Sequence, residues 1–133
     1  MKRVITLILL LCMSLGICCH ASAKTPDMSP QWTNILYLSN DIAFQGTNGS
    51  VVASAYGKSG TTAISGTLTV YKQMGSDWEY IDSESGVSTT ATLFIDLDFI
   101  AESGCNYKAV FDVVVTRNGV DEPGNKTTEK RCP

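Results

Sequence analysis

The chain has 133 residues, of which 10 are lysine or arginine and 13 are aspartate or glutamate, so its formal net charge at pH 7 is −3. This length fits a single domain that is large enough to fold around its own core. A mildly acidic chain without a basic cluster lacks the positive surface that binds phosphate backbones. We therefore expect no nucleic acid as a partner, and no attraction to an anionic membrane surface.

The segment 1–23 has the pattern of a secretory signal peptide. Two cations follow the initial methionine, and the apolar stretch 4–19 is shorter than the roughly 20 residues that a membrane-spanning helix needs. Small residues at 21–23 fit the signal peptidase motif, so we expect cleavage between Ala23 and Lys24. A retained apolar helix and a bacterial lipid anchor are the alternatives. The predicted location of the mature protein is secreted and extracellular, with no membrane attachment after cleavage.

Cleavage at this point would remove the only histidine, His20, and three of the five cysteines. A serine or cysteine nucleophile would then lack an imidazole base, and a histidine-ligated zinc or copper site could not form. We expect a protein that is not an enzyme and that uses no cofactor and no metal. A calcium site with oxygen ligands from Asp96, Asp98 and Glu102 is an alternative, although outward-facing aspartates on a β-sandwich are usually just solvated.

The residues after the signal peptide read as a short disordered lead-in at 24–31 and one all-β domain at 32–133. In this domain the hydrophobic period is two residues, which indicates half-buried strands. The alternation is clearest in 87–99, where the odd positions are mostly apolar, and it recurs in 64–71 and 107–116. Further strands are expected near 33–45, 50–57, 78–83 and 120–131.

Turn motifs separate these segments, among them Ser85-Gly86 and Asn118-Gly119. About seven short strands and no convincing helix predict a single antiparallel β-sandwich, immunoglobulin-like or fibronectin III-like, with a small barrel as the alternative. The last strand is almost wholly polar and contains Pro123, as is typical of an edge strand that avoids pairing with other chains.

Two cysteines would remain after cleavage, and we predict a disulfide between Cys105 and Cys132. Asn118-Gly119 favours a two-residue type I′ hairpin turn, and this turn places Cys105 opposite Cys132 at the far end of the hairpin. An oxidising environment favours their pairing. Unpaired thiols and an intermolecular disulfide are the alternatives, and a bulge at Pro123-Gly124 would shift the register by one residue.

The sequence Glu-Ser-Gly-Cys-Asn-Tyr at 102–107 resembles the turn and tyrosine corner of fibronectin type III and immunoglobulin-like domains. In these domains a tyrosine near the start of the sixth strand hydrogen-bonds back to the corner before it. The resemblance implies that Tyr107 has a structural role and no catalytic one.

A wider resemblance is to an uncharacterised family of small secreted proteins from Gram-positive, Firmicute-type bacteria. It rests on the motifs at 32–35 and 59–73, on Trp78 with Ile81, and on Gly104 with Tyr107. The resemblance implies an exported β-sandwich, but it brings no assigned activity.

Exposed aromatic side chains are the candidates for a binding site. Tyr71 and Phe94 occupy the polar phase of their strands, and Tyr80 is a third candidate, whereas Trp78 is predicted to lie in the core. Rings on a sheet face can stack on sugars or contact a protein, although cross-strand packing alone also explains such positions.

We therefore predict a secreted, non-catalytic binding or interaction module whose partner is an extracellular protein or a glycan. One alternative is a carbohydrate-binding module that uses Tyr71, Tyr80 and Phe94. The other is a small secreted effector or bacteriocin-like protein.

Overall fold

The computed structural model describes residues 31–133, and these form seven strands: β1 (Ile35–Gln45), β2 (Asn48–Gly57), β3 (Thr61–Met74), β4 (Asp77–Ser88), β5 (Thr92–Ile100), β6 (Asn106–Arg117) and β7 (Val120–Arg131). This part of the chain contains no helix, and hence none that could cross a membrane. The predicted all-β domain is confirmed. The predicted signal peptide at 1–23, its cleavage between Ala23 and Lys24, and nearly all of the lead-in at 24–31 lie outside the described residues.

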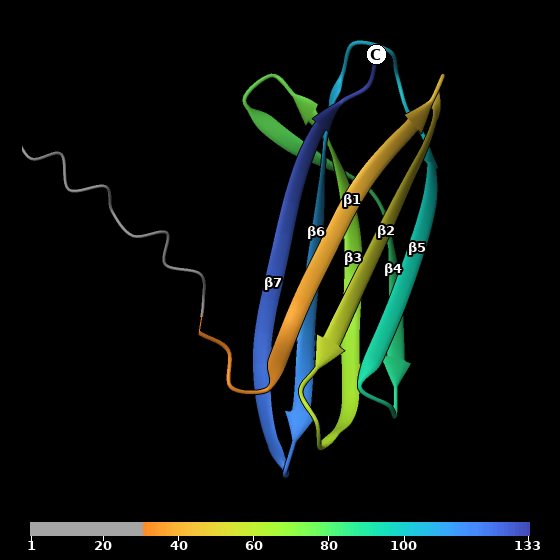
Figure 1. Cartoon of the computed structure of the whole chain (residues 1–133). Coiled ribbons are helices and arrows are strands. Elements are labelled where there is room, and N and C mark those ends of the chain that lie inside the picture. Colours follow the sequence, from red (N-terminus) through yellow and green to blue (C-terminus); the bar gives the residue numbers. More distant parts are fainter. Residues whose placement is uncertain (1–30) are drawn as a thin grey trace, which may run out of the picture. The chain divides into compact units, whose positions relative to one another are not determined.

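The strands form two antiparallel sheets that face each other as a sandwich (Figure 1). One sheet has the strand order β1-β2-β5 and the other has the order β4-β3-β6-β7. Because β4 pairs with β3 and not with β5, the strand order is that of a fibronectin III-like sandwich. In constant immunoglobulin domains the fourth strand belongs to the other sheet. The predicted sandwich is confirmed, and the barrel alternative is wrong.

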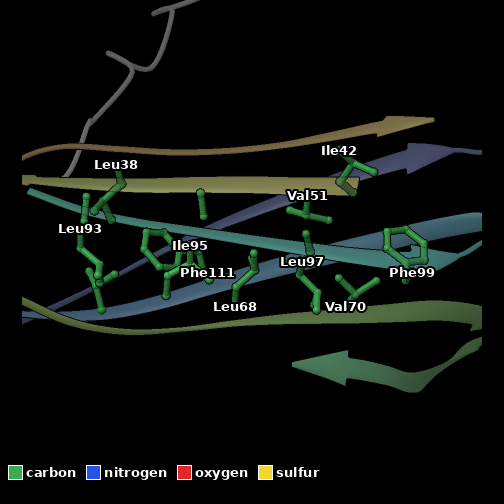
Figure 2. Close-up of a cluster of buried hydrophobic side chains, with 14 of the residues drawn as sticks. Leu38, Ile42, Val51, Leu68, Val70, Leu93, Ile95, Leu97, Phe99 and Phe111 are labelled. Carbon is green, nitrogen blue, oxygen red and sulfur yellow. The ribbon is translucent and has the colours of Figure 1, made fainter. Parts of the chain in front are cut away.

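The core lies between the sheets and consists of the inward positions of the two-residue pattern. Figure 2 shows these side chains reaching from both sheets into one layer. The alternation predicted for 64–71 and 107–116 is confirmed, because alternate residues there are buried. The largest fully buried side chains are Tyr107, Phe111, Ile35, Ile42, Ile64, Leu68, Val51, Val70, Val115 and Cys132.

The alternation predicts a single strand over 87–99, but the structure divides this segment between two strands. β4 ends at Ser88, and the chain crosses to the other sheet before β5 begins at Thr92. Val87 therefore belongs to the end of β4 and is 75% exposed, whereas the inward residues of β5 are buried as predicted. These are Leu93, Ile95, Leu97 and Phe99.

The turn predicted at Ser85-Gly86 is wrong, because Gly86 lies inside β4 and pairs with Gly66 of β3. Both glycines face the core. A Cβ at Gly66 would lie about 2.9 Å from the Phe111 ring, and one at Gly86 about 3.3 Å from Leu93. The glycines are needed for close packing and do not mark a turn.

The β6–β7 hairpin has the predicted turn and register. Asn118 and Gly119 have φ angles of 53° and 71°, as a type I′ turn requires. The ladder then continues without a shift as far as Asn106 opposite Arg131. The bulge predicted at Pro123-Gly124 is therefore wrong. Gly124 stays in the ladder, and the Ile35 side chain fills the space that a Cβ would occupy.

Glu122 on β7 fixes the start of β1. Its carboxylate accepts hydrogen bonds from the backbone N–H groups of Thr33, Asn34 and Ile35, at 2.6, 2.6 and 2.8 Å. The Asn34 side chain also donates to two carbonyls near the tip of the β6–β7 hairpin. Burial raises the pKa of Glu122, but the three backbone hydrogen bonds together lower it by more. The pKa of Glu122 therefore lies below its usual value near 4.5.

We expect the substitution Glu122→Gln to lower the free energy of unfolding at neutral pH by about 1 to 2 kcal/mol. This value begins below the roughly 1.5 to 3 kcal/mol that is typical of hydrogen bonds to a charged group, because the carboxylate is partly exposed. The folded-state pKa is depressed, so this stabilisation is present above pH 4.5 and is lost as the pH falls through the folded-state pKa. Urea unfolding of both proteins across this pH range should give stabilities that converge in acid.

The matched control is Glu129→Gln, because Glu129 is an exposed carboxylate on the same strand. We expect this variant to follow the wild type at every pH. Equal stability of the Glu122→Gln protein and the wild type at neutral pH would contradict the role of the Glu122 carboxylate.

Candidate functional site

The three predicted ligand-binding residues lie on two different faces of the sandwich. Tyr71 on β3 and Tyr80 on β4 are register partners on the four-stranded sheet. Phe94 lies on β5 of the three-stranded sheet and points away from the core. The structure thus brings Tyr71 and Tyr80 together and leaves Phe94 on the opposite side of the molecule.

A β-bulge shapes the part of the sheet that carries the tyrosines. The β3–β4 register shifts between Val70 and Tyr71, so that Val70 opposes Asp82 while Tyr71 opposes Tyr80. The residue passed over, Ile81, packs against the core. Bulges bend a strand and increase its twist, and in Figure 1 the β3–β4 hairpin bends away from the line of the other strands beyond this point.

An aromatic–lysine cluster, made of Tyr71, Trp78, Tyr80 and Lys108, occupies this bend. The Tyr71 and Tyr80 rings are 6.4 Å apart and nearly perpendicular, at 81°. The Lys108 Nζ atom lies 4.3 Å from the centroid of the Trp78 ring and 5.2 Å from that of Tyr71. A cation so placed is attracted by the electron-rich ring faces. The cluster therefore combines apolar rings with a fixed positive charge.

Trp78 is half-buried in this cluster and does not belong to the core, which corrects the prediction for this residue. It is the register partner of Gln73 and has the strand phase opposite to that of Ile81, which packs against the core. Lys108 covers one face of its ring. The size of a tryptophan side chain favours assigning it to the core. In this strand, however, the alternation of inward and outward positions determines that Trp78 faces outward.

Polar groups border the cluster on the same outer face. The Asn106 Nδ2 atom donates to the Gln73 Oε1 atom at 2.8 Å, which leaves further amide donors and acceptors free to meet a ligand. Farther along the sheet a shallow hollow of about 590 Å³ is lined by residues that include Thr67, Ser85, Asp112 and Asn125. We call this feature the hydroxyl hollow, since the Thr67 and Ser85 hydroxyls meet at 2.8 Å.

On the other sheet, Phe94 is one end of an aromatic row that crosses three strands. The Tyr37 and Tyr56 rings are 6.2 Å apart, and those of Tyr56 and Phe94 are 5.8 Å apart. Sequence reasoning missed Tyr37 and Tyr56. Both occupy the outward phase of their strands, so the same alternation that singled out Phe94 could have found them.

Tyr107 has the contact expected of a corner tyrosine. It is buried, and its hydroxyl accepts a hydrogen bond from the backbone N–H of Glu102 at 2.7 Å. Glu102 in turn pairs with Lys72 of β3 at 2.7 Å. The hydrogen bond and charge of Lys72 hold the pKa of Glu102 below its usual value, and the same hydrogen bond to Glu102 raises the pKa of Lys72. These groups hold the corner in place.

The acidic side chains considered as calcium ligands do not converge. Glu102 pairs with Lys72 on the four-stranded sheet, whereas Asp96 and Asp98 project outward from β5. Across residues 31–133, no group of three or more histidine, cysteine, aspartate or glutamate side chains is arranged to hold a metal ion.

Cys105 and Cys132 lie opposite each other at the end of the β6–β7 hairpin, as predicted, but both are free cysteines. The Cys132 N–H donates to the Cys105 carbonyl, while the Cys132 carbonyl accepts from Gly104. Gly104 and Cys105 therefore both oppose Cys132, and the pairing is irregular at this end of the hairpin. The Cys132 thiol is directed towards the Gly46 carbonyl and that of Cys105 towards Glu102, so the predicted disulfide is not formed in the structure.

No protein-family model matches the chain, and no curated protein matches it. Among solved structures, the solution structure of CsgH from R. palustris is similar to it, with 20% sequence identity and a TM-score of 0.43 over 66% of this chain and 87% of that one. Spo0M, a sporulation control protein from Bacillus subtilis, has 11% identity and a TM-score of 0.39 over 72% of this chain and 49% of its own. Neither likeness carries information on function, and the resemblance to a Firmicute family stays a prediction.

The contact between Lys108 and Trp78 can be measured by a double-mutant cycle with Lys108→Met and Trp78→Leu. We expect a coupling energy of about 0.5 to 1 kcal/mol in unfolding experiments, the value typical of exposed cation–π pairs. A parallel cycle that combines Lys108→Met with Tyr56→Leu, on the other sheet, should give a coupling near zero. A coupling that is equally small in both cycles would show that the ammonium group does not interact with the indole ring.

Proposed function

We propose that the chain acts outside the cell as a non-catalytic binding module whose ligand lies on the outer face of the four-stranded sheet. The observation that carries this proposal is the aromatic–lysine cluster. Its rings and its cation lie outside the core, beside amide groups that can bond to a ligand. Sites for small ligands typically combine aromatic surface with a few placed polar groups.

The non-catalytic part of the proposal is supported by the roles of the titratable groups. The side chains with shifted pKa values in the described region are Lys72, Glu102 and Glu122. Each of them holds a loop or a strand end in place, and none belongs to the aromatic–lysine cluster. The only histidine of the sequence, His20, precedes the domain. The extracellular part rests on the signal-peptide pattern at 1–23.

A saccharide is the ligand class that this face supports best. Amide groups adjoin the rings, and the hydroxyl hollow extends the polar surface along the sheet. Lys108 covers one face of the Trp78 ring, and the Tyr71 and Tyr80 rings are nearly perpendicular. Stacking is therefore expected on Tyr80, the most exposed ring of the cluster at 56%. The effector or bacteriocin-like alternative has no comparable feature in its favour.

A glycan array with plant, animal and bacterial saccharides tests this proposal directly. We expect the purified protein to bind a subset of the array, and titration of a bound oligosaccharide to change the fluorescence of Trp78. Tyr80→Ala should weaken binding at least about fivefold, since stacking on an aromatic side chain contributes roughly 1 to 3 kcal/mol where it is known for nucleobases.

The matched control is Phe94→Ala, which removes an equally exposed ring from the opposite face and should leave saccharide affinity unchanged. An array without signal would rule out the saccharide. Equal losses in both variants would place the binding site elsewhere.

A further inference from the structure

The outer face of the three-stranded sheet has a chemistry that nothing in the fold requires. We call it the acidic–aromatic face. It lies on the far side of the sandwich from the proposed saccharide site and is independent of it. The face consists of the outward side chains of β1, β2 and β5, chiefly Tyr37, Tyr56, Phe94, Val52, Asp41, Asp96 and Asp98.

Aromatic rings cross this face from one strand to the next. The row of Tyr37, Tyr56 and Phe94 spans all three strands with ring separations of 5.8 to 6.2 Å. Val52 is a diagonal neighbour of Phe94, because Val52 opposes Asp96 and Ser54 opposes Phe94. Phe94 is 64% exposed and Val52 is 54% exposed. Contiguous apolar groups of this kind on a soluble domain mark interaction sites.

The charge on the same face has a single sign. Asp41 and Asp96 lie on either side of Val52 in register, so about two strand spacings, roughly 10 Å, separate them. Asp98 follows Asp96 on the same side of β5, about 7 Å along the strand. None of the three strands contains a lysine or an arginine.

Two lysines from neighbouring segments do not neutralise these aspartates. The ammonium group of Lys130 donates to the Ile42 carbonyl, and that of Lys58 donates to the Trp32 carbonyl. The carboxylates of the face are therefore available to an external cation.

A shallow hollow lies beside Asp98, at the end of the face that is farther from the aromatic row. Its volume is about 560 Å³, and its lining includes Ala43, Ser50, Asp98 and Ile100. A side chain of a docked segment can enter this hollow with its charge next to Asp98. The face thus offers apolar contact at one end, carboxylates in the middle and a recess at the other end.

We propose that the acidic–aromatic face docks a basic amphipathic segment of a partner protein. Apolar side chains of that segment pack on Tyr56, Phe94 and Val52, and its lysines or arginines pair with the aspartates. Aromatic residues near the centre of an interface supply much of the binding energy, while complementary charge gives specificity and a faster association rate.

Charge complementarity selects this occupant over the others. A second copy of the chain would bring the same aspartates face to face, because a two-fold contact places identical surfaces together. Nucleic acids and anionic membranes carry the same charge sign as the face. A neutral sugar would leave the charge of Asp41, Asp96 and Asp98 without a cationic partner.

The test uses the purified protein and an alternating Leu-Lys peptide of about twelve residues, with Leu-Glu and Ser-Lys peptides of equal length as comparisons. We expect the Leu-Lys peptide to bind and to shift the backbone NMR signals of β1, β2 and β5. Its affinity should fall at least about tenfold in Phe94→Ala and in the double variant Asp96→Asn with Asp98→Asn. Added salt should weaken it further.

Matched controls lie on the opposite face. Asp112→Asn removes an exposed carboxylate there, and Tyr80→Ala removes an exposed ring, so both variants should bind the Leu-Lys peptide like the wild type. All the substituted side chains are exposed, and the unfolding curve of each variant verifies that it is folded.

Three results would overturn the proposal. The first is that the Leu-Lys and Leu-Glu peptides bind equally well, or that neither peptide binds. The second is a loss of affinity in Asp112→Asn as large as that in the β5 double variant, which would indicate attraction to the net charge of the protein alone. The third is sedimentation as a dimer that Phe94→Ala dissociates, which would make a second copy the occupant. A blank glycan array would leave this test unaffected.

Discussion

The Phe111 ring fills the space over Gly66, where Leu93 of the opposite sheet also packs. A Cβ on Gly66 would lie within about 3 Å of this ring and of Leu93, so the space between the sheets is already filled. Interiors packed to this density do not accept added atoms without strain. With the inward positions of β3, β4 and β6 fixed in this way, the remaining side chains of each strand must point to solvent. Both candidate binding faces follow from this division.

Polar side chains close the sandwich where the ladders stop. Thr128 and Lys130 of β7 donate to the carbonyls of Asn40 and Ile42 on β1, and the Asn40 side chain donates to carbonyls of β6 and β7. These contacts join the two sheets along one edge without a shared ladder. They also engage carbonyl groups of β1 that could otherwise pair with the strand of another chain. Glu122 and Tyr107 anchor the two ends of the molecule in the same manner.

The two-residue alternation predicted which side of a strand is buried, and this held for β3, β6 and the inward positions of β5. The alternation does not show where the chain changes sheets, because Val87 and Leu93 share the same phase although Val87 belongs to β4 and Leu93 to β5. Nor does it say which sheet an outward ring belongs to. The alternation alone therefore groups Phe94 and Tyr71 in one site, whereas the structure places them on opposite faces.

Local chemistry predicted some features that alternation could not. Asn118-Gly119 specified the turn, and hence the register of an entire hairpin, because few residues adopt two consecutive positive φ angles. The cluster around Lys108 required knowledge of cross-strand neighbours, since its members come from three strands. A β-bulge between Val70 and Tyr71 also contributes, and no turn residue or glycine marks this bulge in the sequence.

The two faces differ in charge as well as in position. The face of the four-stranded sheet mixes Lys108 and Arg131 with Glu129 and Asp112, whereas the opposite face carries aspartates alone. A close-packed core about 10 Å thick separates them. One ligand can alter the affinity for another only if it favours one of two protein conformations, and the core around Phe111 has no space for an added Cβ at Gly66. The two ligands that we propose would lie on opposite sides of this core, and we expect each of them to bind as if the other face were empty.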